Sequence, residues 1–247
     1  MPKKNALVTG SSRGIGRAIA LRLAQDGWNV AVHFTGSDEL ARQTAEALSD
    51  RCLGVYQADL YDPDKAVALA EKVIEEHGLG ALVNNAGVYR TTDFLNDPEE
   101  DVEKEFNDTF NVNWHSPRRM ALHSCRHFAQ NGGGKVLNIV SRVAHRGEAF
   151  ATAYSTSKAA LLNLTRALAV ETAKQDIQHF AIAPGWVETA MVRKDMDQRL
   201  PEILATIPLG RMATPEDVAA AAAYLLSDEA AYLSGTVIDI NGASYLR

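Results

Sequence analysis

The chain has 247 residues, of which 46% are hydrophobic and 23% are charged, and its formal net charge at pH 7 is −6. This length suits one large α/β domain with a single core, and the composition is that of an ordinary globular protein. The acidic balance argues against a nucleic acid or an anionic membrane surface as the main partner. The two cysteines have no metal-ligand spacing and suit a reducing compartment, so we expect no metal site.

The first residues, MPKKNALVTG, contain two lysines but reach a glycine after only a few apolar positions. This apolar stretch is too short for a signal peptide. No run of about 18 apolar residues is free of charges, so none predicts a transmembrane helix. We therefore expect a cytoplasmic protein that does not enter a membrane.

Short apolar, β-branched runs alternate along the chain with longer segments of helical period. The runs predict strands at 5–9, 29–34, 53–57, 81–85, 135–140, 178–183 and 236–240. Clear helix patterns between them lie at 16–27, 63–78 and 214–227. Strands that alternate with helices imply a parallel sheet with helices on both faces, and right-handed crossovers make it doubly wound. We expect one domain over residues 1–247.

Local signals mark the ends of two of these helices. Gly78 stands in the usual stop position after the helix at 63–78. Thr214 is the expected N-cap of the helix at 214–227, with Pro215 at its first position.

The segment 186–213 departs from the alternation because prolines interrupt a helical pattern rich in Met and Leu. It predicts either a flap over a binding site or an irregular connection. Trp186, Met191 and Met196 would give such a flap an apolar surface, although residues of these types more often simply pack.

The stretch VTGSSRGIG follows the first predicted strand and opens the first helix. Its glycines, Gly10, Gly14 and Gly16, allow a tight turn whose backbone can approach a pyrophosphate at a helix N-terminus. Glycine-rich turns without a ligand also occur, but a position between strand and helix is the context that a dinucleotide site requires.

The end of the second strand distinguishes the two nicotinamide cofactors. An NAD site typically has an acidic residue there, whereas this strand ends with His33 and runs on to Thr35. Arg13 can present a planar fork of donors to a 2′-phosphate, or it can be a solvated turn residue. The missing acid and the available arginine favour NADP(H). Asp59 is expected either to accept from the adenine amino group or to cap the helix near Pro63.

Tyr154 and Lys158 are four residues apart at the start of a long apolar helix, so they project from one face. An ammonium nearby lowers the pKa of a phenol, although the pair could also belong to an ordinary amphipathic helix. Ser141 ends the fifth strand, at the sheet edge where ligands bind, and its hydroxyl could hold a carbonyl oxygen. Asn113, amid helix-breaking residues, could hold a water or act as a cap.

These features together resemble the short-chain dehydrogenase/reductase family over essentially the whole chain. The motifs are LVTGSSRGIG, LVNNAG, VNW, Ser141, YSTSK, APGWVET, GRMATPEDVA and SGTVIDINGA. The resemblance implies a single Rossmann domain with a seven-stranded parallel sheet. It also implies an oxidoreductase that uses NADPH to reduce a carbonyl group to an alcohol.

The resemblance assigns roles to individual residues. Tyr154 would be the acid/base, and Lys158 would bind the nicotinamide ribose and lower the pKa of the tyrosine. Ser141 would orient the carbonyl, and Asn113 would hold a water in a proton relay. The implied cofactor contacts are Gly10, Ser12, Arg13, Gly14, Ile15, Gly16, Thr35, Asp59, Leu60, Asn85, Ala86, Gly87, Tyr154, Lys158, Pro184, Gly185, Val187 and Thr189.

Two positions depart from the family pattern. Gly80 stands where an acidic residue usually precedes LVNNAG, and Ala243 ends the motif NGA, where a second glycine is common. Neither change removes an expected catalytic group.

Within the family, the pattern is most similar to the 3-oxoacyl-[acyl-carrier-protein] reductase group. An acidic carrier protein would need basic residues beside the cleft, and the candidates are Lys135, Arg142, Arg146 and Lys174. Another small ketone or aldehyde is the alternative substrate. Family members usually form homotetramers, here through helices at 102–130 and 154–175. A non-catalytic NADP(H)-binding regulator or scaffold is the rival interpretation, and the intact Ser–Tyr–Lys set argues against it.

Overall fold

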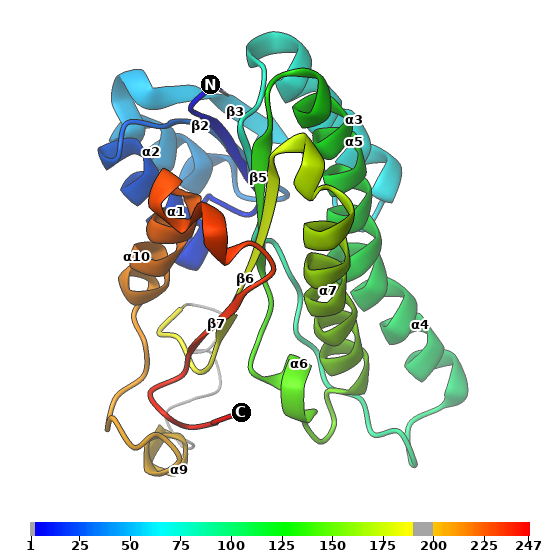
Figure 1. Cartoon of the computed structure of the whole chain (residues 1–247). Coiled ribbons are helices and arrows are strands. Elements are labelled where there is room, and N and C mark those ends of the chain that lie inside the picture. Colours follow the sequence, from blue (N-terminus) through cyan, green and yellow to red (C-terminus); the bar gives the residue numbers. More distant parts are fainter. Residues whose placement is uncertain (1–2, 190–199) are drawn as a thin grey trace.

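The computed structural model describes residues 3–189 and 200–247, which form a parallel sheet of seven strands between two layers of helices (Figure 1). The strand order is β3-β2-β1-β4-β5-β6-β7. The chain therefore winds outward from β1 in one direction, returns to β4 and winds outward in the other. This arrangement confirms the predicted doubly wound Rossmann architecture.

The strands agree with the sequence prediction to within one residue at each end. They are β1 (Asn5–Val8), β2 (Asn29–Phe34), β3 (Cys52–Gln57), β4 (Ala81–Asn84), β5 (Gly134–Ile139), β6 (Ile177–Pro184) and β7 (Val237–Ile240).

The longer helices are α1 (Gly14–Gln25), α2 (Asp38–Leu48), α3 (Pro63–His77), α4 (Glu99–Phe110), α5 (Ser116–Gln130), α7 (Thr152–Glu171) and α10 (Pro215–Leu226). Shorter elements are η1 (Ser49–Arg51), η2 (Asn111–His115), α6 (Val143–Arg146), η3 (Ala173–Gln175), α9 (Leu200–Ala205) and η4 (Asp228–Leu233).

The sheet is buried on both faces because helices cover each of them. Figure 1 shows α1, α2 and α10 on one side and α3, α5 and α7 on the other. Side chains alternate along a strand, so Ala6 and Val8 of β1 join the core under α1 and α10, while Leu7 joins the core under α3 and α5. A central strand that is apolar at every position is typical of a parallel sheet.

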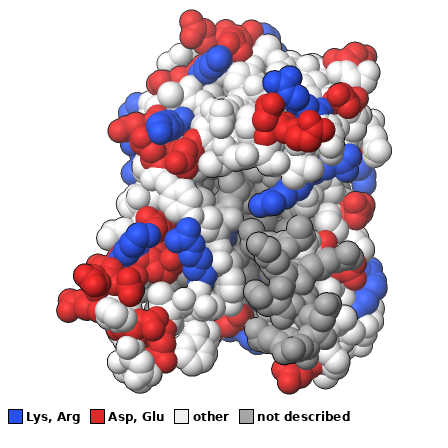
Figure 2. All heavy atoms as spheres, turned by 180° about the vertical axis from the view of Figure 1, so that it is seen from behind, with Lys and Arg blue, Asp and Glu red and all other residues white. Residues whose placement is uncertain are grey.

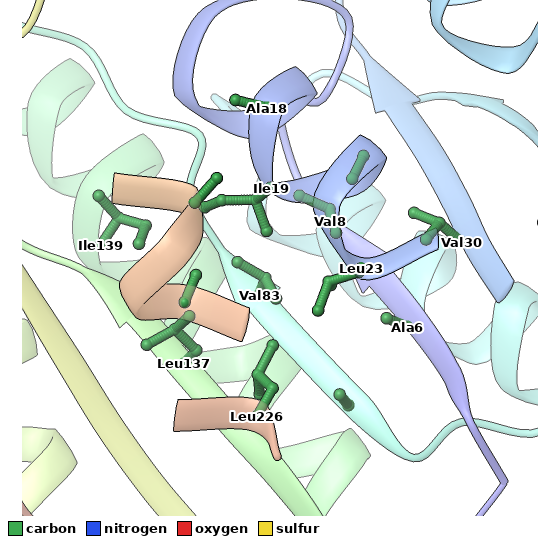
Figure 3. Close-up of a cluster of buried hydrophobic side chains, with 14 of the residues drawn as sticks. Ala6, Val8, Ala18, Ile19, Leu23, Val30, Val83, Leu137, Ile139 and Leu226 are labelled. Atoms are coloured by element: carbon green, nitrogen blue, oxygen red, sulfur yellow. The ribbon is translucent and has the colours of Figure 1, made fainter. Parts of the chain in front are cut away.

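The core under α1 and α10 is formed by small and branched side chains that interlock over the sheet. Figure 3 shows Ile19 and Leu23 of α1 meeting the strand residues Val83 and Leu137, with Leu226 of α10 beside them. This packing holds α1 directly behind the glycine turn.

The start of α10 agrees with the predicted signals. The Thr214 hydroxyl accepts from the Asp217 N–H at 3.2 Å, and the Asp217 carboxylate accepts from the Thr214 N–H at 2.9 Å. This reciprocal capping box, with Pro215 in the first turn, satisfies donors that the helix itself cannot pair. Gly78 follows α3 with a φ of +67°, which side chains disfavour, so the predicted stop position is a glycine that the backbone needs.

The structure leaves room only for glycine at position 80, where the family pattern has an acidic residue. A Cβ at this position would overlap the carbonyl oxygen of Lys3, so the crossing chain leaves no room for an acidic side chain. The backbone of Gly80 still donates to the Asn5 carbonyl at 2.9 Å and accepts from the Lys135 N–H at 2.9 Å. With glycine at position 80, both backbone hydrogen bonds of this residue are therefore formed.

Part of the segment 186–213 can be described. Residues 190–199, with Met191 and Met196, lie outside the described residues. In the remainder, Val187 pairs with Ala213 in a parallel bridge. Ile203 of α9 forms a small apolar cluster with Ile207 and Met212, and Trp186 packs against it. A role as a substrate flap stays a prediction.

No helix in the described part of the chain is both long enough and apolar enough to cross a membrane.

Two buried histidines make the fold sensitive to acid. Burial lowers the pKa of His33 and of His179 to about 4. An exposed histidine in the unfolded chain titrates near 6.5, so between about pH 6.5 and pH 4 the unfolded state binds more protons and the folded state loses stability. By pH 5 each histidine should remove about 2 kcal/mol from the free energy of unfolding.

We expect His179→Gln to lose about 2 kcal/mol less than the wild type between pH 7 and pH 5, because it lacks one of these groups. Urea unfolding at the two pH values measures the difference. An identical pH dependence in both proteins would show that His179 is not a neutral buried group.

Candidate active site

The candidate site lies at the carboxyl edge of the sheet, where β1, β4, β5 and β6 end beside one another. In a doubly wound sheet this edge, near the point where the strand order reverses, is where ligands bind. The glycine turn follows β1, the NNAG loop follows β4, Ser141 follows β5, and the loop from Gly185 follows β6.

The glycine turn has the geometry that its sequence predicts. Gly10 and Gly14 have φ angles of +65° and +56°, which side chains disfavour. A Cβ on Gly16 would overlap the Asn85 amide and the Gly10 carbonyl, so the turn can close only with glycine there. Ser12 and Ile15 lie in the same turn, where Ser12 is buried.

The N-terminus of α1 has no side-chain cap and no acidic residue in its first turn. Its first N–H groups have no partner within the helix, and together with the helix dipole they favour an anion. The turn therefore fits the diphosphate of a dinucleotide.

The turn is tied to the loop after β4 by Thr9, which the sequence prediction missed. The Thr9 hydroxyl accepts from the N–H groups of Asn85 and Ala86 at 2.9 and 3.0 Å. In return, the Asn85 amide donates to the Thr9 carbonyl at 2.7 Å. Thr9 is 1% exposed, so its hydroxyl depends on these protein partners. The available signal is a threonine directly before the first glycine.

His33 supports the same turn from β2. Its Nδ1 accepts from the Gly10 N–H at 2.9 Å, so Nε2 carries the proton and donates to the Ala58 carbonyl at 3.1 Å. The ring is buried and turned inward. Beyond it, Thr35 is exposed and donates to the same Ala58 carbonyl at 3.0 Å, and Arg13 is exposed at the start of α1. Sequence reasoning assigned no role to His33.

Asp59 does not cap the helix after β3. Its carboxylate accepts from the Tyr61 N–H at 3.1 Å, whereas Asp62 caps α3 by accepting from the Asp64 N–H at 2.9 Å. The capping alternative for Asp59 is therefore wrong, and the adenine contact stays a prediction. Leu60 is buried beside it.

Tyr154 and Lys158 project from the first turns of α7 toward the end of β5. The Tyr154 ring is partly buried and packs edge-on against Tyr89, with 5.0 Å between ring centroids. Lys158 is 3% exposed, and its Nζ donates to the Ile139 carbonyl at 2.9 Å. That Nζ lies 5.8 Å from the centroid of the Tyr154 ring. Ser141 forms a side-chain hydrogen bond with the phenol.

Lys158 was expected to lower the pKa of Tyr154. With the groups of the protein by themselves, this direction is wrong. Burial raises the pKa of Tyr154 to about 12, and the hydrogen bond with Ser141 only partly opposes this rise. Burial also lowers the pKa of Lys158 to about 8. The reason is that loss of hydration disfavours both charged forms, while the ammonium is directed at the Ile139 carbonyl. The phenol therefore keeps its proton at neutral pH.

Asn113 lies in a π-helical turn, η2, between α4 and α5. Its Nδ2 donates to the Val88 carbonyl at 3.0 Å and to the Ser157 hydroxyl at 3.2 Å, and its Oδ1 accepts from the Val88 N–H at 2.9 Å. The side chain thus braces the loop after β4 against α7 and is not a helix cap. Such widened turns are frequent at functional sites. A water held at Asn113 stays a prediction.

The remaining expected residues converge on the same edge. A Cβ on Gly87 would lie 3.2 Å from both the Asn113 Oδ1 and the Lys158 Nζ. Pro184 ends β6 and Gly185 donates to the Ile240 carbonyl at 2.8 Å. The methyl group of Thr189 lies 3.4 Å from the position of a Cβ on Gly14, which brings the loop after β6 to the glycine turn.

The predicted carrier-protein surface is wrong in two of its four residues. Lys135 is 6% exposed and donates to the Leu226 carbonyl at 3.1 Å, at the end of α10. Arg142 is 5% exposed. Lys174 is exposed but follows the far end of α7, about 30 Å along the helix from the site. Figure 2 shows acidic and basic side chains interspersed on the face that it displays.

Comparison with known proteins identifies the family. A family model described as Enoyl-(Acyl carrier protein) reductase matches residues 10–243. The chain is 34% identical over 246 residues to the 3-oxoacyl-[acyl-carrier-protein] reductase FabG of Staphylococcus aureus, with 98% of each chain covered. This protein therefore belongs to the short-chain dehydrogenase/reductase family of oxidoreductases.

Solved structures agree with the fold. A putative NAD(P) dependent gluconate 5-dehydrogenase from Beutenbergia cavernae, with bound NADP at low occupancy, has a TM-score of 0.90 at 32% identity, covering 99% of this chain and 97% of that one. A blue fluorescent protein from a metagenomic library, in complex with NADPH, has a TM-score of 0.89 at 31% identity, covering 99% of both chains.

We expect the Thr9 hydroxyl to contribute to the free energy of unfolding through the two N–H groups that it accepts. Thr9→Val leaves the N–H groups of Asn85 and Ala86 without their acceptor, and we expect the free energy of unfolding to fall by about 2–3 kcal/mol. Thr9→Ser keeps the hydroxyl and should lose less than about 1 kcal/mol, the value of one buried methyl group. Urea unfolding measures both. Equal losses would mean that the hydrogen bonds contribute little.

Proposed function

We propose that this protein binds NADPH along the carboxyl edge of the sheet and reduces a small carbonyl compound to an alcohol. The observation that carries the proposal is the convergence of Ser141, Tyr154 and Lys158, from the end of β5 and the start of α7, beside the glycine turn. A hydroxyl bonded to a protonated phenol, with a buried amine nearby, supplies the groups that carbonyl reduction needs.

Three features support NADP(H) as the cofactor. Arg13 is exposed at the start of α1, where its planar fork can meet a 2′-phosphate. The end of β2 carries a buried neutral histidine in place of the acid that binds an unphosphorylated ribose. Two structural relatives contain NADP or NADPH. In the proposed complex the uncapped N-terminus of α1 holds the diphosphate, and Lys158 binds the nicotinamide ribose.

When bound, NADPH would supply the hydride that the carbonyl carbon needs. Ser141 holds the carbonyl oxygen, and Tyr154 gives its proton to that oxygen as the C=O bond becomes an alcohol. The high pKa of the buried phenol ensures that this proton is present at neutral pH. Lys158 is the nearby cation that stabilises the phenolate left behind, and Asn113 holds the α7 turn in place.

A small soluble substrate is better supported than an acyl group on a carrier protein. A curated relative is a 3-oxoacyl-[acyl-carrier-protein] reductase, but the basic residues expected to meet an acidic carrier do not form a surface here. Arg146 is the only one of the four that is both exposed and close in sequence to Ser141. We propose small ketones and aldehydes as substrates.

We also propose a cytoplasmic homotetramer, as the family resemblance implies. Leu122 of α5 is 42% exposed and Val170 of α7 is 83% exposed, so both helices present apolar side chains that a second copy could cover. The two cysteines are free, which suits a reducing compartment.

Tyr154→Phe should abolish reduction because it removes the proton donor and little else. We expect kcat to fall by a factor of about 10² to 10⁴, while the Kd for NADPH stays within about twofold because the phenyl ring preserves the packing. Oxidation of NADPH, followed by its absorbance with a panel of ketones, aldehydes and 3-oxoacyl thioesters, measures turnover. Fluorescence titration measures binding. NADPH binding without turnover of any carbonyl would favour a regulatory protein.

Arg13 should select the phosphorylated cofactor. Arg13→Gln removes the charged donors to the 2′-phosphate, and we expect the Kd for NADPH to rise by about 10- to 100-fold. The Kd for NADH should change little. Fluorescence titrations of both cofactors against both proteins provide the comparison. A wild-type protein that prefers NADH would contradict the assignment of Arg13.

A further inference from the structure

Arg142 is a buried charge directly beside the candidate catalytic serine. It is 5% exposed, and its Nη1 donates to the Ser244 hydroxyl at 2.8 Å. The centre of its guanidinium lies 5.4 Å from the centroid of the Trp186 ring. Within residues 3–189 and 200–247, no carboxylate forms an ion pair with it.

This arrangement is unusual for an arginine. A guanidinium has five N–H donors and remains charged in proteins. Burying such a group without a carboxylate partner is unfavourable, because its lost hydration is not replaced. One neutral hydroxyl and an aromatic ring compensate only in part. Two charged groups act on the Arg142 guanidinium. Arg146 adds further positive potential there, and Glu148 opposes it.

Arg142 directly follows Ser141, one of the residues proposed to take part in the reaction. Its N–H donates to the Pro184 carbonyl at 2.9 Å, so its backbone bridges the ends of β5 and β6. The preceding residue, Ser141, bonds to the Tyr154 phenol. The guanidinium lies over the ring of Trp186. Trp186 comes two residues after Pro184 and packs against the apolar cluster that includes Ile203 of α9. The guanidinium is thus held against Ser244 and Trp186, at the start of the segment 186–213, while the backbone of Arg142 directly follows Ser141.

A purely structural role does not require this residue. Ser244 would be satisfied by a neutral donor, and a ring can be packed by an apolar side chain. What only an arginine provides is a charged planar fork, and this geometry matches a carboxylate through two parallel hydrogen bonds.

We propose that Arg142 is a specificity-determining residue that binds a carboxylate on the substrate. The preferred substrates are then oxo acids, in which a carboxylate lies a few carbons from the ketone that Ser141 and Tyr154 engage. This inference rests on the proposed carbonyl reductase activity and names its substrate class. It separates the protein from a reductase of neutral ketones or of thioesters, whose acyl chains carry no such charge.

The test compares oxo acids with their methyl esters. We would measure kcat/KM with NADPH for 2-, 3-, 4- and 5-oxo acids, each beside its ester, which keeps the ketone and removes the charge. For the best acid we expect the wild type to prefer the acid over its ester by about 100-fold. The acid with the highest value gives the spacing between the two subsites.

Arg142→Met keeps the length of the side chain and removes its charge. We expect it to lose about 100-fold in kcat/KM for the acid, mainly through KM, while the ester and the Kd for NADPH stay close to wild type. Arg142→Lys should recover part of the loss, because it restores the charge without the fork. Arg146→Gln is the matched control: it removes an exposed positive charge four residues later and should leave the acid preference intact.

The outcomes separate this inference from the proposed function. A wild type that reduces acids and esters equally, or an Arg142→Met variant that loses both equally, overturns the role of Arg142 and leaves the reductase intact. If no carbonyl is reduced at all, the proposed function fails. In that case, calorimetric titration of the oxo acids into the protein with NADP⁺ still decides the inference. Binding that disappears in Arg142→Met supports it, and absence of binding to the wild type overturns it.

Discussion

The candidate site depends on hydrogen bonds that join two neighbouring parallel strands just past their carboxyl ends. Thr9 accepts two N–H groups of the loop after β4, and the Asn85 amide returns a bond to its carbonyl. His33 holds the other side of the turn by accepting from Gly10. Together they connect the turn proposed to bind the diphosphate with the loop that contains Gly87, which lies close to the Lys158 Nζ. Because Thr9 and His33 are buried, loss of these bonds would leave their polar atoms without partners.

Loss of hydration controls the chemistry of this edge. It raises the pKa of Tyr154 and lowers that of Lys158, so the chain alone has a phenol that retains its proton and an amine that gives up its charge more readily than usual. Burial also lowers the pKa of Arg142, because loss of hydration disfavours the charged guanidinium. Three groups within the candidate site thus lie in surroundings that disfavour their charged forms. Such groups gather where a protein binds or transforms a ligand.

Some features of the candidate site follow from the family resemblance, and others depend on residues that the resemblance does not assign. The fold, the glycine turn and the Ser–Tyr–Lys set follow from the family resemblance, whereas the contact between Arg142 and Trp186 does not follow from it. Gly80 departs from the family pattern, and the crossing backbone at Lys3 excludes any side chain there. A family assignment thus identifies the reaction class, and the surroundings of Ser141 bear on the substrate.

The sequence by itself determined the elements and the class of fold. Strand ends were predicted to within one residue, because apolar period, glycines and prolines act over a few neighbouring positions. The glycine turn and the Tyr154–Lys158 pair were predictable for the same reason. Tertiary structure decided what depends on contacts between distant residues. It placed Lys135 under the end of α10, gave the cap of α3 to Asp62 in place of Asp59, and widened the helix at Asn113. It also reversed the expected direction of the Tyr154 pKa, since burial is set by the whole fold and not by the residue four positions away.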